Sequence, residues 1–376
     1  MIYFDSAATT SIDPEVINYM SDILANVYGN PSSIHKLGQD AKAVIEKSRR
    51  QIANCLNAKS NEIYFTGGGT ESNNLILRGL LKSGDHFITS SIEHPAILKT
   101  IDYLELKGIH TTIIQPNKFG QITLNKIQNA IEPNTKLVSI MYVNNELGTI
   151  NNIEEIGDFL KIKNILFHTD AVQAIGKKSI LLEKLNIDYL SASAHKFHGP
   201  KGVGLLYCRD KANIYPQITG GGQERNLRAG TENISGIAGM GLALEISMNK
   251  LIFFNKHIKK LENQLINELN ILNIDFRRNG INQISGLCNL TLFDIPGQLL
   301  ILNLDLKGIA ISFGSACASG STKPSIIYNK IGIPEDEAKS TIRISISRFN
   351  TSEEITKLTN AMAEIIPTIK RNTIHV

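Results

Sequence analysis

Short apolar runs alternate with segments of helical periodicity between residues 62 and 192 of this 376-residue chain. The runs occupy residues 63–65, 87–90, 111–114, 137–143, 165–167 and 189–192. Helical patterns, such as those at 124–131 and 153–160, separate most of them. Strands that alternate with helices usually pair in parallel and are covered by helices on both faces. The sequence therefore predicts an α/β fold with a mainly parallel central sheet.

A different pattern begins near residue 232. Two long helical segments, 233–248 and 251–272, are followed by shorter apolar runs and by an amphipathic helix that starts at Ser352. A chain of this length can bury two cores. We therefore place a domain boundary near residue 250, between a large domain of residues 13–250 and a smaller α+β domain of residues 251–376.

The composition limits the kinds of binding partner and the cellular compartment that we expect for this chain. The net charge is only +4 and no basic block is present, so a nucleic-acid partner is not expected. We find neither a signal-peptide pattern nor an apolar run of roughly 18 residues, so no membrane segment is expected. The four cysteines are widely spaced and form no CxxC pair, which favours a reducing, cytoplasmic location and argues against structural zinc.

Lys196 is the residue that suggests a specific chemistry. It follows the apolar run 189–194 and stands among small residues and glycines, which allow a planar ligand to approach the backbone. A lysine in a tight pocket can lose its proton and attack a carbonyl to form a Schiff base. Asp170 ends another apolar run, and pyridoxal phosphate enzymes need both a lysine and an acid partner for the ring nitrogen. Taken alone, Lys196 would be interpreted as an exposed loop lysine, and Asp170 is the observation that weighs against that interpretation.

Other polar residues follow the apolar runs in the same way. In parallel sheets ligands bind beyond the carboxyl ends of the strands, and Thr70, His94 and Asn145 all fall there. The glycine turn at 65–71 precedes a helix and suits a phosphate, although it matches neither a dinucleotide nor a nucleoside-triphosphate motif.

Two residues of the C-terminal part also stand out. Arg343 lies on an alternating apolar strand and needs an anionic partner, which could be a substrate carboxylate or a structural salt bridge. Cys317 lies in a segment of small residues, 312–324, unlike the apolar surroundings of Cys208 and Cys288. An exposed thiol on such a segment is a candidate nucleophile, and a loop cysteine without a role is the alternative.

The segment Ser191-Ala-Ser-Ala-His-Lys-Phe-His-Gly-Pro-Lys-Gly202 resembles the cofactor-lysine segment of the cysteine desulfurases. These enzymes form part of the class V aminotransferase-like branch of the fold-type I pyridoxal phosphate enzymes. Further segments resemble family motifs in family order, over nearly the whole chain: residues 5–10, 29–33, 69–74, 93–95, 143–148, 170–173, 228–231, 314–317 and 342–345. Ser6 and Ala194 depart from the family pattern by small changes. The resemblance implies a fold-type I transferase whose smaller domain also includes residues 1–12.

The resemblance also implies roles for individual residues. Lys196 would hold pyridoxal 5'-phosphate, Asp170 would pair with its ring nitrogen, and Gln173 would reach its ring hydroxyl. Further roles follow: Gly69, Thr70, Ser193 and His195 for the phosphate, His94 for ring stacking and proton transfer, Asn145 for the cofactor and the substrate, Arg343 for the substrate carboxylate, and Thr231 for the phosphate of the neighbouring subunit in a homodimer.

The activity implied is that of a cysteine desulfurase. L-Cysteine would be converted to L-alanine, and the sulfur would remain on Cys317 as a persulfide. A sulfur-acceptor protein, either a scaffold or a sulfurtransferase, would then receive it for iron–sulfur clusters or tRNA thiolation. We expect no resident metal, with at most a transient iron–sulfur contact at Cys317. A selenocysteine lyase, another class V aminotransferase-like enzyme and a catalytically silent partner protein on the same fold are the alternatives.

Overall fold

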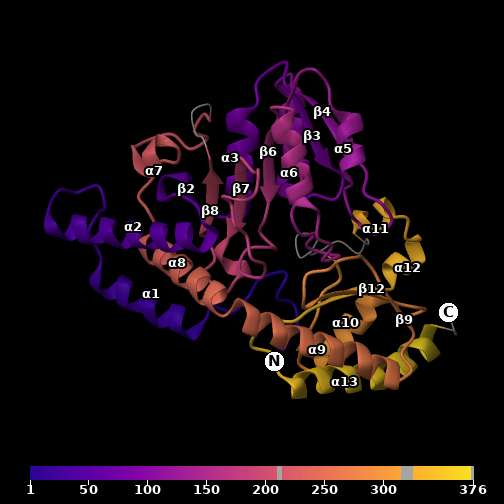
Figure 1. Ribbon diagram of the computed structural model, residues 1–376. Helices are drawn as coiled ribbons and strands as arrows, with labels where there is room; N and C mark the ends of the chain where they lie inside the picture. Colours follow the sequence, from indigo (N-terminus) through magenta and orange to yellow (C-terminus); the bar gives the residue numbers. More distant parts are fainter. Residues whose placement is uncertain (210–213, 315–324, 374–376) are drawn as a thin grey trace.

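The computed structural model describes residues 1–209, 214–314 and 325–373 (Figure 1). Its largest sheet has the strand order β2-β8-β7-β6-β5-β3-β4. The bounds of these strands are β2 (Ile63–Thr66), β3 (His86–Ser90), β4 (His110–Ile114), β5 (Thr135–Ser139), β6 (Leu166–Asp170), β7 (Tyr189–Ser193) and β8 (Gly204–Cys208). From β7 to β4 all neighbours pair in parallel, whereas β8 is antiparallel to β2 and β7. The predicted α/β fold with a mainly parallel sheet is confirmed.

Helices cover both faces of this sheet because successive strand residues point to opposite sides. Phe87 of β3 belongs to one apolar cluster and Ile88 to another, and Tyr64 and Phe65 of β2 divide in the same way. On the side of Phe87 lie α3 (Gly69–Leu80) and α4 (Pro95–Leu106). The cluster around Ile88 includes residues of α1 (Pro14–Asn26), α2 (Lys36–Leu56), α5 (Leu124–Ala130), α6 (Ile153–Ile162) and α8 (Ile234–Asn249).

The C-terminal third builds a separate apolar core. Its elements are α9 (Leu251–Ile271), β9 (Phe276–Arg278), β10 (Leu287–Leu292), α10 (Gly297–Leu306), β11 (Ile309–Ala310), α11 (Ile326–Lys330), α12 (Glu335–Lys339), β12 (Thr341–Ser345) and α13 (Ser352–Thr373). Phe4 is buried in this core, and β1 (Ile2–Tyr3) pairs with β11. In Figure 1 α9, α10, β9, β12 and α13 lie below the large sheet, whereas α11 and α12 lie to the right, where their apolar residues form a small cluster with Ile92 and Leu147. The domain boundaries at 13–250 and at 1–12 with 251–376 stay a prediction.

Two apolar runs form shorter strands than their length indicated. The run 137–143 is a strand only as far as Ser139, because Met141 and Val143 then line a cavity described below. Residues 309–313, one of the shorter apolar runs that follow residue 272, contribute only the two residues of β11, and Ser312 beyond them makes a single bridge to Arg343.

Helices α8 and α9 meet at a bend of 73°. Among the described residues, no single helix has both the length and the apolar composition needed to cross a membrane, and only this bent pair meets the two criteria when taken together.

A buried ion pair fixes the loop that contains the short helical segment α7 (Gln223–Asn226). Arg49 of α2 donates two hydrogen bonds, of 2.8 and 2.7 Å, to the carboxylate of Glu224 and a third to the carbonyl of Ile63. Glu224 also accepts the backbone N–H of Phe65 on β2. Both charged side chains are almost fully buried, so α2, β2 and this loop depend on one charged contact.

Arg49→Leu leaves the Glu224 carboxylate buried without its cation. We expect a loss of about 3–5 kcal/mol in the free energy of unfolding, the range typical of a broken buried pair. Arg50→Leu is the matched control, because Arg50 is the exposed neighbour on the same helix. Urea unfolding of both variants checks this, and equal stabilities would contradict the role assigned to the pair.

Candidate active site

A cavity of about 220 Å³ lies at the carboxyl ends of the parallel strands. It is lined by Ala7, Ala8, Gly69, Thr70, Asn73, His94, Met141, Val143, Asn145, Asp170, Val172, Gln173, Ser193, His195, Lys196 and Arg343. Every site residue predicted from the sequence is in this set except Thr231 and Cys317. Residues from the ends of five strands (β2, β3, β5, β6 and β7), from the N-terminal segment and from β12 therefore meet in one place.

Lys196 ends a short 3₁₀ turn, Ala194–Lys196, that directly follows β7. Its Nζ donates hydrogen bonds to the carbonyl oxygens of Ala7 at 2.8 Å and Ala8 at 2.6 Å. The next residue, Phe197, is buried in the apolar cluster around Ile88, on one face of the large sheet, and anchors the turn. The amine is thus held against the cavity wall formed by the N-terminal segment.

Asp170 is the last residue of β6, and its side chain is almost fully buried. One carboxylate oxygen accepts a hydrogen bond of 2.8 Å from the side-chain amide of Asn73, and the other accepts the backbone N–H of Val172 at 3.0 Å. Each oxygen keeps a further lone pair for a partner in the cavity. Sequence reasoning did not single out Asn73, although it stands inside one of the quoted motifs.

Gln173 and Lys177 extend this network behind the cavity. The Gln173 amide donates to the carbonyl of Ala7 at 2.8 Å, and its oxygen accepts from Lys177 Nζ at 2.8 Å. Burial, and then the charges of Lys196 and Arg343, lower the pKa of Lys177 to about 7. Nothing in the sequence pattern marked Lys177, because its position depends on contacts between distant segments.

The predicted phosphate residues lie where this cavity adjoins a larger, open one of about 760 Å³. Gly69, Thr70, Ser193 and His195 line both. Gly69 and Thr70 open α3, whose N-terminal amides and dipole favour an anion. The larger cavity also includes the side chains of Lys201 and Arg228, which add positive charge.

The glycine turn before α3 requires a close backbone approach. A Cβ atom on Gly204 would lie 2.6 Å from the backbone of Gly68, so no larger residue fits there without displacement. His195 lies beside the turn, and its Nδ1 is 3.0 Å from the hydroxyl of Thr9. Burial and the nearby lysines lower the pKa of His195 to about 4, so its ring is neutral at physiological pH.

His94 caps α4 from the cavity side. Its Nδ1 accepts the backbone N–H of Ala96 at 3.1 Å, and Pro95 occupies the first helical position, where no N–H is needed. An acceptor Nδ1 assigns the proton of the neutral ring to Nε2. The capping bond therefore fixes which nitrogen can exchange a proton in the cavity.

Arg343 makes the structural salt bridge that its sequence pattern allowed, and it also lines the cavity. It is 1% exposed on β12, and its guanidinium donates to Asp5 at 2.7 Å and to the carbonyl of Asn145 at 2.8 Å. Within the described part of the chain its buried Nε has no hydrogen-bond partner.

The two remaining predicted residues are Thr231 and Cys317. Thr231 is exposed and does not line the cavity. Cys317 lies outside the described residues. The described residues on either side, Gly314 and Ser325, lie close to Glu146, the neighbour of Asn145: the Ser325 hydroxyl donates to Glu146 at 2.9 Å, and a Cβ on Gly314 would lie 3.3 Å from its carboxylate.

Glu93 is a buried carboxyl group that sequence reasoning passed over. One oxygen accepts from the Ser90 hydroxyl at 2.6 Å and from the backbone N–H of Met141 at 3.0 Å. The other has no partner among the described residues. Burial raises the pKa of Glu93 to about 8, with a smaller contribution from the charge of Asp170. Glu93 thus joins the loop that carries His94 to the cavity wall at Met141.

The comparisons with known proteins agree along the whole chain. The Aminotransferase class-V family model matches residues 2–358. "Cysteine desulfurase IscS" of Methanosarcina thermophila is 42% identical over 98% of this chain and 93% of that relative, and the protein of the same name from Dictyoglomus turgidum is 40% identical over 98% and 95%. Among solved structures, a "NifS-like protein" has a TM-score of 0.91 at 38% identity, covering 98% of this chain and 99% of that one. "SspA in complex with cysteine" has a TM-score of 0.83 at 38% identity, covering 93% and 100%.

Glu93→Gln tests the buried carboxyl group through its pH dependence. The pKa of about 8 in the folded state exceeds the ordinary 4.5, so the stability contributed by neutral Glu93 is complete below pH 4.5 and is lost as pH rises through 8. The glutamine side chain keeps the shape of Glu93 but stays neutral at every pH. Between about pH 5 and pH 8, the free energy of unfolding of the wild type should fall relative to that of the variant.

Urea unfolding at both pH values checks this, since other groups titrate in both proteins and cancel. Glu105→Gln is the control, because Glu105 is exposed on α4 and its replacement should leave the pH dependence unchanged. Parallel pH profiles for the wild type and Glu93→Gln would mean that Glu93 is ionised in the folded protein.

Proposed function

Because this chain belongs to the class-V aminotransferase family, we propose that it is a cysteine desulfurase that uses pyridoxal 5'-phosphate to convert L-cysteine to L-alanine. The observation that carries the proposal is the cavity in which the Lys196 amine and the Asp170 carboxylate lie together with the glycine turn and Arg343. The names of the relatives support it, as does the structural neighbour with bound cysteine.

The residues of the cavity fit the cofactor. Lys196 would hold its carbonyl carbon, Asp170 its ring nitrogen and Gln173 its ring hydroxyl, with His94 against the ring. Gly69, Thr70, Ser193 and His195 would hold its phosphate at the start of α3. When bound, the cofactor withdraws electrons from the substrate's α-carbon. The buried carboxylate of Asp170 keeps the ring nitrogen protonated, which this electron withdrawal requires.

The chain's own groups would bind the substrate and move its protons. Arg343 and Asn145 would bind the α-carboxylate; the guanidinium is already oriented by Asp5 and the Asn145 carbonyl. The Lys196 amine and the Nε2 atom of His94 would take and return the proton of the α-carbon. The polar network around Lys196 holds its amine in place for this transfer.

The sulfur step requires a thiolate. The Cys317 thiolate would attack the substrate sulfur, so that a sulfur–sulfur bond forms and the bond from sulfur to the β-carbon breaks. The electron pair stays on carbon, and a proton added there gives alanine, while Cys317 keeps the sulfur as a persulfide. A sulfur-acceptor protein would then take the sulfur for iron–sulfur clusters or tRNA thiolation.

Two observations support Cys317 as the nucleophile. Gly314, the last described residue before Cys317 in the chain, lies beside Glu146, the neighbour of Asn145 in the cavity wall. The other thiols are unsuited: burial raises the pKa of Cys55 to about 11 and that of Cys288 to about 12, and Cys208 is buried. Cys55 and Cys288 would therefore stay protonated at physiological pH.

We also propose a homodimer in which Thr231 completes the partner's site. Thr231 is exposed and lies three residues after Arg228, which lines the larger cavity. The ion pair between Arg228 and Glu71, at 2.9 Å, fixes this segment near the start of α3. Thr231 is thus exposed and lies near the end of its own chain's cavity where the phosphate would bind. Such a position suits a contact with the same end of the partner's cavity across a two-fold axis. The cytoplasmic location stays a prediction.

A complementation experiment tests the dimer and Lys196 together. Lys196→Ala should abolish alanine release, and Thr231→Glu should reduce it strongly because the new carboxylate repels the phosphate. A mixed dimer contains one site with an intact Lys196 from one chain and an intact Thr231 from the other. Co-expression of the two variants should therefore restore activity, measured as alanine release by purified mixed dimers.

The result shows whether Thr231 serves the site of its own chain or that of the partner. If Thr231 served its own chain, every site of the mixed dimer would be defective and no activity would return. Retention of a borohydride-reducible cofactor on another lysine in Lys196→Ala would contradict the assignment of Lys196.

Cys317→Ser tests the sulfur step itself. A serine hydroxyl is too basic to replace the thiolate, so the variant should bind the cofactor and change its visible spectrum with L-cysteine but release no alanine and carry no persulfide. Serine variants of Cys55, Cys208 and Cys288 that fold are the controls and should keep most of their activity. An alanine assay and mass spectrometry of the trapped persulfide measure both effects.

The outcome separates a desulfurase from its relatives. A transaminase, or a lyase that expels sulfur without an enzyme thiol, would not depend on Cys317. Cysteine-dependent alanine release by Cys317→Ser near the wild-type rate would overturn the mechanism while leaving the cofactor site unaffected.

A further inference from the structure

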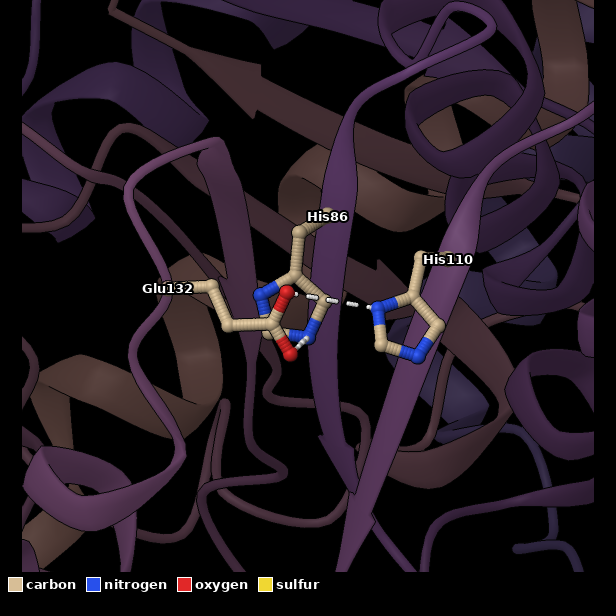
Figure 2. Close-up of side chains that lie close together, drawn as sticks. All are labelled: His86, His110 and Glu132. Atoms are coloured by element: carbon tan, nitrogen blue, oxygen red, sulfur yellow. Dashed lines mark ion pairs between the residues drawn. The ribbon is translucent and has the colours of Figure 1, made fainter.

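Two histidines and a glutamate converge at the edge of the large sheet opposite the candidate active site. His86 is the first residue of β3 and His110 the first residue of β4, and the two are direct neighbours in the parallel pairing. Glu132 lies in the turn that leads into β5, whose first residue, Thr135, pairs with His86. Figure 2 shows the Glu132 carboxylate reaching toward both rings. Among the described residues, this group offers three metal-ligating atoms within 4.8 Å of one another.

The distances between these atoms suit a small cation. His86 Nε2 is 3.7 Å from one carboxylate oxygen of Glu132, and His110 Nδ1 is 3.4 Å from the other. Ligands bound at about 2.0–2.2 Å to a tetrahedral zinc ion lie about 3.3–3.5 Å apart. The two N–O separations are close to these values, and all three ligating atoms lie within 4.8 Å of one another, so binding requires the side chains to draw together, above all the exposed His110.

The buried histidine is already oriented as a ligand. The Thr135 hydroxyl accepts the backbone N–H of Glu132 at 2.7 Å and lies 2.8 Å from Nδ1 of His86. We assign the ring proton to Nδ1, donated to this hydroxyl, which leaves the lone pair of Nε2 as an acceptor. Ligating histidines typically donate their second ring nitrogen to such an outer partner. A bound ion would replace the hydrogen bond between Nε2 and the Thr112 hydroxyl, which is 2.9 Å away.

An ordinary ion pair explains the arrangement less well. The two imidazole rings are stacked, with centroids 5.0 Å apart and an angle of 28° between their planes. Glu132 directs one carboxylate oxygen toward each ring, so all three groups converge on one space. An ion pair would need only one of the two rings, whereas a bound cation uses both.

We propose that His86, His110 and Glu132 bind a divalent transition-metal ion of the zinc class. Two imidazole nitrogens and one carboxylate are ligands that zinc prefers, whereas magnesium and calcium prefer oxygen ligands alone. Glu132 and His110 are partly exposed, which leaves a solvent side through which the ion enters and where water completes its coordination. The site ties together the starts of β3 and the edge strand β4 with the turn before β5.

This site is separate from the proposed desulfurase chemistry. Its ligands stand at or before the first residues of β3, β4 and β5, whereas the candidate active site lies at the carboxyl ends of the strands. Since an ion that binds only the folded chain stabilises it by mass action, the expected consequence of binding is a more stable sheet edge.

The test measures zinc binding by the cofactor-loaded protein carrying Cys317→Ser, which removes the thiol proposed to be reactive. After treatment with a chelator, this protein is titrated with ZnCl₂ against a chromogenic chelator. We expect one tightly bound Zn²⁺ per chain and no competition from MgCl₂. Adding His110→Ala or Glu132→Gln should weaken binding at least about tenfold, since each removes a ligand.

Glu105→Gln is the matched control for Glu132→Gln, because it makes the same change of charge at an exposed position and should leave zinc affinity unchanged. Thermal unfolding gives a second readout: Zn²⁺ should raise the melting temperature of the parent protein and not that of His110→Ala. Circular dichroism verifies that each variant is folded. The proposal is overturned if the parent binds no zinc, or if folded His110→Ala and Glu132→Gln both bind it as tightly as the parent.

Discussion

The site depends on the short N-terminal segment of residues 5–10, which joins the two apolar cores. Ala7 offers its carbonyl to both Lys196 and Gln173, and its backbone N–H donates to the hydroxyl of Ser345 on β12. Asp5 pairs with Arg343, so the same segment orients the predicted cofactor lysine and the predicted substrate arginine. A displacement of these few residues would disturb both groups at once.

The fold could be predicted largely from the sequence, because apolar periodicity is a local property. Each apolar run of the first half became a strand of the large sheet, and the family indicated by the motifs is confirmed by the comparisons. The order of the strands, and the antiparallel insertion of β8 between β2 and β7, could not be predicted from local pattern. Pairing between distant strands is set by packing of the whole domain, which no single run encodes.

The sequence indicated most of the residues that line the candidate cavity, but not the residues that support them. Motifs pointed to Lys196 and Asp170, yet Asn73, Glu93 and Lys177 act through contacts between distant residues, and no motif marked their partners. The histidine–glutamate cluster illustrates the same limit. Its residues lie on separate strands without the short spacing of a metal motif, and only the register of β3 with β4 and β5 brings them together.

The visible absorption spectrum of the purified protein, recorded before and after addition of L-cysteine, tests the central claim most directly. The claim is that Lys196 and Asp170 form a site for pyridoxal phosphate at which cysteine reacts. The account predicts a visible band from the lysine-bound cofactor and a rapid change of that band with L-cysteine, followed by release of alanine. Absence of a visible band after incubation with pyridoxal phosphate, or a band that L-cysteine leaves unchanged, would contradict it.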